Sequence, residues 1–175
     1  MSTAAAARPK PSEYAPYYER YVSRVPDGDI VRTLESQLEE TLALIRGIPE
    51  ARGDFRYAEG KWSIKELLGH VIDSERVFTY RALRFGRGDT TPLPGFEQDD
   101  FVRGADFSKR TLSDLADEYE HVRRATISLF ASLDGGAWDR RGKANDTEVS
   151  VRGIAFIIAG HERHHVEILK TRYLV

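Results

Sequence analysis

Cysteine is absent from this 175-residue sequence, so neither disulfides nor thiolate clusters can hold the fold together. Histidine and carboxylate are therefore the only strong metal ligands that the chain offers. An excess of one charge is also missing, because 26 basic and 28 acidic residues leave a net charge of only −2. This balance argues against a surface for phosphate backbones or anionic membranes, and we expect no nucleic-acid partner.

Long hydrophobic runs are missing as well. The longest candidate, residues 154–159, falls far short of the roughly 18 to 20 apolar residues that a membrane span requires. The first ten residues contain no long apolar segment behind a basic one, as a secretory signal would need. We therefore expect a soluble protein without a membrane partner, with the cytoplasm as its default location.

The hydrophobic content of 41% is enough to build one sizeable core, which predicts one domain. The small and polar residues at the start predict a disordered arm over residues 1–11, followed by a single domain over residues 12–175. Residues 12–24 carry four tyrosines, three of them on one helical side, and Pro26 follows. This pattern predicts a short N-terminal docking helix.

Four longer segments have helical spacing of apolar residues and recognisable ends. Asp29 is the expected N-cap of the first, which ends at Gly47. The sequence Ser63-Ile64-Lys65-Glu66 is a capping box that begins the second, and the glycines around residues 86–88 end it. The third is expected over residues 111–133, and the fourth from Ser150 to about residue 173.

The connections complete the predicted fold. Residues 90–110 are rich in proline, glycine and aspartate and form a longer connection than most helix pairs have, which predicts a lid or a crossover. We interpret residues 138–148 as a loop and expect no strand of useful length. The predicted fold is all-α, a four-helix bundle, and the long connection between the second and third helices allows a topology other than strict up-and-down.

The strongest chemical signal lies in the last helix. His161 and His165 are four residues apart, so they stack on one side of a helix within reach of a single ion. The same side carries isoleucines at the spacing of a core-facing seam. An inward polar group without a partner costs about 1–3 kcal/mol, so two such imidazoles require hydrogen-bond partners or a metal.

His70 on the second helix supplies a third imidazole, and Gly69 beside it leaves room for close helix approach. Three imidazoles and a water molecule are typical of an open, catalytic divalent site, where the water becomes a hydroxide nucleophile or the ion acts as a Lewis acid. Hydrogen-bonded core histidines are the alternative interpretation. His164, one position off the seam, is interpreted as a surface group or as a group that supports a ligand from behind, and His121, on the third helix, as a half-exposed residue outside the site.

The chain resembles the DinB/YfiT-like superfamily of metalloenzymes over residues 29–174. The matching features are Trp62-Ser63-Ile64, Leu67-Leu68-Gly69-His70 and the terminal Gly160-His161-Glu162-Arg163-His164-His165. The resemblance implies a four-helix bundle with one crossover, and a metal held by the residues matching His70, His161 and His165. It also implies zinc or nickel in many members and frequent homodimers, and it implies no DNA binding.

Residues 92–99 also resemble a loop found in one branch of that superfamily. We expect this loop to approach the metal, which makes Glu97, Gln98 and Asp99 candidates for substrate contact or proton transfer. A solvated acidic loop is the alternative. Asp73 and Glu75 follow His70 closely and are candidates for orienting an imidazole ring.

The leading functional hypothesis is a metal-dependent enzyme that acts on a small molecule. It is either a hydrolase that activates water or a transferase that activates a low-molecular-weight thiol, as relatives working with bacillithiol or mycothiol do. The alternative is a noncatalytic, stress-associated helical protein that binds a metal or a small ligand, and a helical interaction module is a third. Among metals we expect zinc first, with nickel, iron and manganese also suited to three imidazoles.

Overall fold

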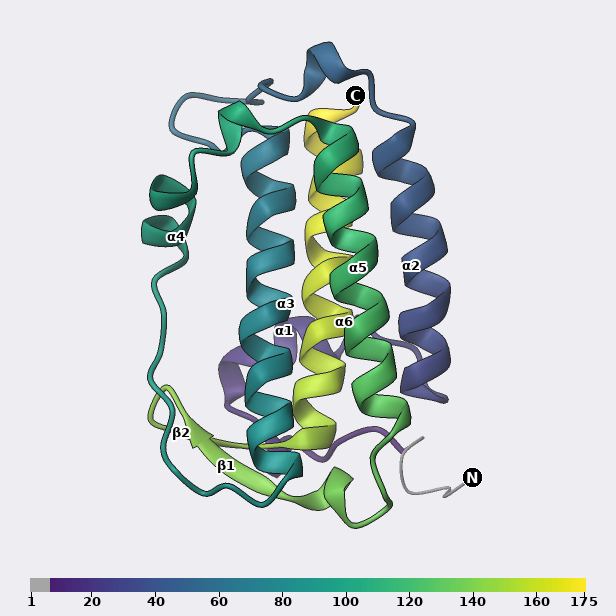
Figure 1. Cartoon of the computed structure of the whole chain (residues 1–175), viewed down its shortest axis with the longest axis vertical. Coiled ribbons are helices and arrows are strands. Elements are labelled where there is room, and N and C mark those ends of the chain that lie inside the picture. The colour runs from purple at the N-terminus through teal and green to yellow at the C-terminus, as the bar shows by residue number, and fades with distance from the viewer. Residues whose placement is uncertain (1–6) are drawn as a thin grey trace.

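Four long helices form a bundle in the computed structural model, which describes residues 7–175. They are α2 (Ile30–Arg46), α3 (Ile64–Gly86), α5 (Leu112–Ala131) and α6 (Val151–Ile168). In Figure 1, α2 and α6 run upward whereas α3 and α5 run downward. Because α5 is the next long helix after α3 and runs parallel to it, the chain between them has to return along the length of the bundle. The predicted four-helix bundle with a long crossover is confirmed.

Side chains at the predicted positions cap the helices. The Asp29 carboxylate accepts hydrogen bonds from the first backbone amides of α2, and Ser63 and Glu66 form the reciprocal capping box of α3. Thr111 and Ser150 cap α5 and α6 in the same way. The last helix continues through a π-helical segment, Leu169–Tyr173, so it ends where the sequence predicted.

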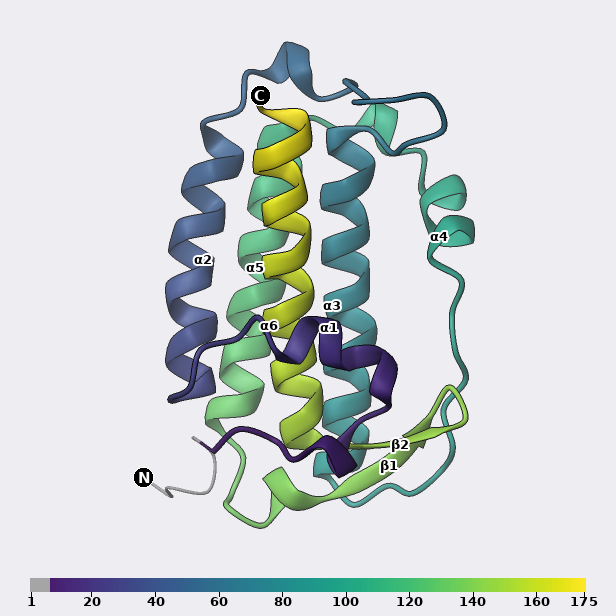
Figure 2. The same cartoon turned by 180° about the vertical axis from the view of Figure 1, so that it is seen from behind.

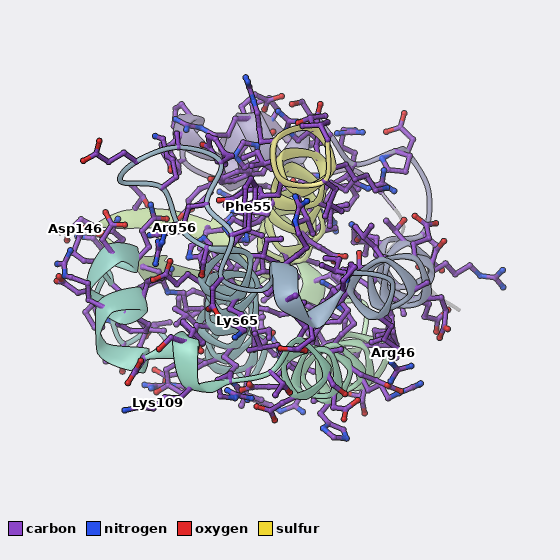
Figure 3. The ribbon with its side chains drawn as sticks, turned by 90° about the horizontal axis from the view of Figure 1, so that it is seen from above. Arg46, Phe55, Arg56, Lys65, Lys109 and Asp146 are labelled. Carbon is purple, nitrogen blue, oxygen red and sulfur yellow. The ribbon has the colours of Figure 1, made fainter. Side chains whose placement is uncertain are left out.

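The crossover contains a short helix that the sequence analysis did not predict, α4 (Gln98–Ala105). It stands outside the four long helices, with Lys109 at the outer edge just after it (Figure 3). Val102 is its one buried residue. With so little apolar surface, α4 has no periodic pattern from which it could be recognised.

The expectation of no strand is wrong, because residues 141–150 form an antiparallel hairpin of β1 (Arg141–Ala144) and β2 (Thr147–Ser150). Asn145 and Asp146 make its turn with φ angles of 50° and 59°, a conformation that these residue types tolerate. Each strand has four residues, too few for a clear alternating pattern. The Leu93 amide donates to the Lys143 carbonyl at 2.9 Å, so the hairpin holds the start of the crossover.

The N-terminal segment is less regular than predicted. Of the expected arm, residues 1–6 lie outside the described residues, and Arg8 donates hydrogen bonds to the Val22 and Val25 carbonyls. The expected docking helix consists of two 3-10 turns, Pro11–Glu13 and Pro16–Tyr18, and of the four-residue α1 (Glu19–Val22). Figure 2 shows α1 lying across α6. Within residues 7–175, no helix combines the length and the apolar character needed to cross a membrane.

Candidate metal centre

The three predicted histidines converge between α3 and α6. The Nε2 atom of His161 lies 3.1 Å from Nε2 of His70 and 3.2 Å from Nε2 of His165. Each ring offers one nitrogen as a possible metal ligand, and these three nitrogens lie within 4.8 Å of one another. In a tetrahedral site with Zn–N bonds of about 2.0–2.1 Å, two nitrogen ligands are roughly 3.3 Å apart. The three rings therefore fit a single divalent ion.

Burial keeps these imidazoles neutral. His70, His161 and His165 are only 3%, 6% and 9% exposed. Desolvation, followed by the charge of neighbouring histidines, lowers the pKa of His70 to about 4 and that of His165 to about 2. The pKa of His161 falls well below its ordinary value for the same reasons. Each ring therefore offers a nitrogen lone pair at neutral pH, as metal binding requires.

Neighbouring rings hold the imidazoles in place. The Trp62 ring centroid lies 4.7 Å from that of His70, and the Tyr21 ring lies 5.2 Å from that of His161. The hydroxyl of Ser74 is 3.4 Å from His70 Nδ1. In contrast, Nδ1 of His165 is buried without a hydrogen-bond partner among the described residues.

The glycine before each of two histidines allows close packing at the site. A Cβ atom on Gly69 would lie 2.2 Å from the Phe107 ring, and one on Gly160 would lie 2.0 Å from the Tyr21 carbonyl oxygen. Real Cβ atoms do not approach other atoms so closely. The small residues in Gly69-His70 and Gly160-His161 therefore let the crossover and α1 pack directly against the two helices that carry the histidines.

A buried ionic network lies beside the histidines and was missed by the sequence analysis. The fully buried Arg123 guanidinium donates to both carboxylate oxygens of Glu75, at 2.8 and 2.7 Å, and also pairs with Glu162. Glu162 accepts further hydrogen bonds from the hydroxyls of Thr41 and Tyr119. Since Glu162 directly follows His161, this network ties the histidine-bearing turn of α6 to α2, α3 and α5.

The two carboxylates proposed to orient an imidazole do not contact one. Glu75 is bound to Arg123 instead, because its side chain points to α5 rather than to His70. Asp73 forms an ion pair with Arg76 at 3.7 Å. Burial raises the pKa of Asp73, an effect that the nearby Arg76 opposes.

Two pockets open onto the histidine cluster. One, of about 500 Å³, is lined by His70 and His161 together with all three predicted loop residues, Glu97, Gln98 and Asp99. The other, of about 340 Å³, is lined by His165 and again by Asp99. The three side chains are exposed and lie at the rim, but Gln98 and Asp99 belong to the first turn of α4 rather than to a loop. The crossover thus brings the candidate loop to the site.

The larger pocket also contains residues that the sequence analysis did not select. They come from the N-terminal segment, from α3 and from the hairpin: Tyr17, Tyr18, Tyr21, Phe78, Arg81, Asn145 and Thr147. A signal for part of this set was present, because His70, Ser74, Phe78 and Arg81 follow steps of four, four and three along α3. The tyrosine pattern predicted a docking helix but not a pocket, and nothing local distinguished the hairpin residues, because both sets reach the pocket through tertiary packing.

The remaining two histidines do not converge with the other three. His121 is exposed on α5. His164 is half-buried, with its ring 5.4 Å from that of Tyr21 and 5.0 Å from that of His165. Burial, followed by the nearby Arg24, lowers the pKa of His164. Neither residue belongs to the convergent set.

Known proteins resemble this chain over most of its length. The sequence profile of the DinB superfamily matches residues 33–169. A protein of Oceanobacillus iheyensis, named provisionally as a metal-dependent hydrolase, is 25% identical over 142 residues, which cover 80% of this chain and 79% of that protein.

Two solved structures share the fold. YfiT from Bacillus subtilis matches with a TM-score of 0.65 and 13% identity over 97% of both chains. It is described, in equally provisional terms, as a metal-dependent hydrolase with an unusual four-helix bundle topology. The DinB-like protein YjoA from Bacillus subtilis matches with a TM-score of 0.58 and 23% identity. That match covers 81% of this chain and 86% of YjoA.

Proposed function

The chain belongs to the DinB superfamily, and from this premise we propose that it is a metal-dependent hydrolase whose divalent ion is held by His70, His161 and His165. One observation carries the proposal: three buried, neutral imidazoles direct ring nitrogens to a common point beside an open pocket. The provisional naming of the Oceanobacillus iheyensis relative as a metal-dependent hydrolase supports the same activity. Zinc is the metal that we expect first, because three neutral imidazoles suit it well.

The residues of the site have separate roles in this proposal. A divalent ion in an open three-histidine site lowers the pKa of water and polarises a carbonyl oxygen. The three imidazoles bind the ion, and the Trp62 and Tyr21 rings fix their orientation. The rim carboxylates of Glu97 and Asp99 are placed to exchange protons with a substrate in the pocket.

Metal content and turnover, measured together, test the proposal. We expect protein purified without a histidine tag to hold about one divalent ion per chain, and to hydrolyse an activated ester such as 4-nitrophenyl acetate only when loaded. His165→Ala removes one of three ligands, so both metal content and turnover should fall sharply. His121→Ala, which removes an exposed histidine of α5, is the matched control and should change neither.

Other outcomes would point to other functions. Full metal content in the His165→Ala variant would refute the ligand assignment. Metal retention without ester turnover, together with consumption of an electrophile in the presence of a low-molecular-weight thiol, would replace the hydrolase by a thiol-dependent transferase. Metal retention with neither activity would support the noncatalytic metal-binding alternative.

A further inference from the structure

Three arginine side chains are buried among residues 7–175, and one of the three has no carboxylate partner there. Arg81, Arg123 and Arg152 are each no more than 9% exposed. Arg123 pairs with the carboxylates of Glu75 and Glu162. Arg152 pairs with those of Glu13 and Asp139. Within residues 7–175, no carboxylate lies at ion-pair distance from Arg81, although it is only 4% exposed. Burying an unpaired charge is costly, so this exception requires a reason.

The contacts that Arg81 does make are with neutral groups. Its Nη2 donates to the Pro94 carbonyl at 2.8 Å. The Tyr18 phenol lies beside it, and because burial raises the pKa of Tyr18, this group supplies no negative charge. The Phe78 and Phe96 rings lie 5.8 and 5.9 Å from Cζ of Arg81. Desolvation lowers the pKa of the Arg81 guanidinium, as expected for a cation that the protein leaves unpaired.

Arg81 faces the same pocket as the histidines. The lining of that pocket includes Arg81, His70 and His161. Phe78 lies between the two groups, with its ring 6.0 Å from that of His161 and 5.8 Å from Cζ of Arg81. A molecule in the pocket can therefore contact the metal centre at one end and the guanidinium at the other, past a single aromatic ring.

We propose that Arg81 binds a carboxylate of the substrate, so that the enzyme acts on small carboxylic acids whose scissile bond is separated from the carboxylate by about the width of one aromatic ring. The planar guanidinium presents five N–H donors, and two of them match the two oxygens of a carboxylate. The exposed carboxylates of Glu97 and Asp99 at the rim disfavour a dianion such as a phosphate monoester. This inference rests on the proposed hydrolase activity, which decides which bond of the substrate is broken.

Calorimetry on the metal-free protein tests the carboxylate site without relying on turnover. Monomethyl adipate carries one carboxylate, and dimethyl adipate is its neutral counterpart of nearly equal size. We expect the wild-type protein to bind the monomethyl ester about 10- to 100-fold more tightly, the usual range for hydrogen bonds to a charged group. In Arg81→Met this difference should disappear. Equal binding of the two esters by the wild-type protein would overturn the inference without any variant.

Arg84→Met is the matched control for the loss of charge. Arg84 lies less than one turn further along α3, outside the set of residues that line the pocket, and pairs with Asp89. We expect this variant to keep the preference for monomethyl adipate. If Arg81→Met and Arg84→Met lose the preference equally while circular dichroism shows both folded, the effect is one of net charge, and the site is refuted.

Turnover separates a failure of this inference from a failure of the hydrolase. With metal-loaded protein, kcat/KM for mono-4-nitrophenyl adipate should exceed that for its methyl ester, and Arg81→Met should reduce that ratio at least tenfold. Metal-dependent turnover without such a ratio in the wild-type protein would refute the role of Arg81 and leave the hydrolase intact. Turnover of neither ester would refute the hydrolase, and the calorimetry would still decide whether Arg81 binds a carboxylate.

Discussion

Replacing Arg123 by Met should destabilise the protein far more than any surface charge change. The guanidinium is fully buried and compensates two buried carboxylates, Glu75 and Glu162. Its removal leaves both without their cation, although Thr41 and Tyr119 still donate to Glu162. Breaking a buried ion pair by removing one partner costs about 3–5 kcal/mol, and methionine keeps the packing of the aliphatic part of the arginine side chain. We therefore expect the free energy of unfolding to fall by that amount.

Urea unfolding at pH 7, followed by circular dichroism, measures this loss. Arg124→Met is the matched control, because the neighbouring Arg124 is exposed and pairs only with Glu120 on the same helix. Solvent screens such an exposed pair, so the control should unfold almost as the wild type does. Adding Glu75→Gln to Arg123→Met should recover part of the loss, because one buried charge is then removed. Equal stability of the Arg123 and Arg124 variants would refute the reasoning.

Two further predictions concern packing and pH. Gly160→Ala should destabilise the protein by about 1–3 kcal/mol in thermal unfolding, because the added Cβ would lie 2.0 Å from the Tyr21 carbonyl oxygen. Gly104→Ala is the control and should not destabilise the protein, because no atom lies within 4 Å of the added Cβ. The metal-free protein should lose stability as the pH falls from about 6.5 toward 4, because unfolding raises the pKa of His70 from about 4 to its ordinary value. Between these pH values the unfolded chain binds more protons than the folded protein does. A midpoint urea concentration that is no lower at pH 5 than at pH 7 would contradict this prediction.

Local patterns in the sequence determined the four long helices and singled out the three candidate metal ligands. Caps such as Asp29 and Ser63 mark helix starts because their side chains satisfy backbone amides only a few residues away. The spacing of His161 and His165 placed both rings on the core side of one helix for an equally local reason, the 3.6-residue period. The length of the segment after α3 indicated a lid or a crossover, and the family resemblance favoured the crossover.

Only the tertiary structure decided what surrounds the histidines. The hairpin is held against the crossover by hydrogen bonds with Leu93, a contact that no short window of sequence contains. Glu75 and Arg81 are both buried charges on α3, yet Glu75 pairs with Arg123 of another helix, whereas Arg81 faces a pocket and has no carboxylate at ion-pair distance within residues 7–175. The sequence could not predict which of the two charges would have an ion-pair partner, because the free energy of a buried charge depends on which distant side chains the fold brings to it.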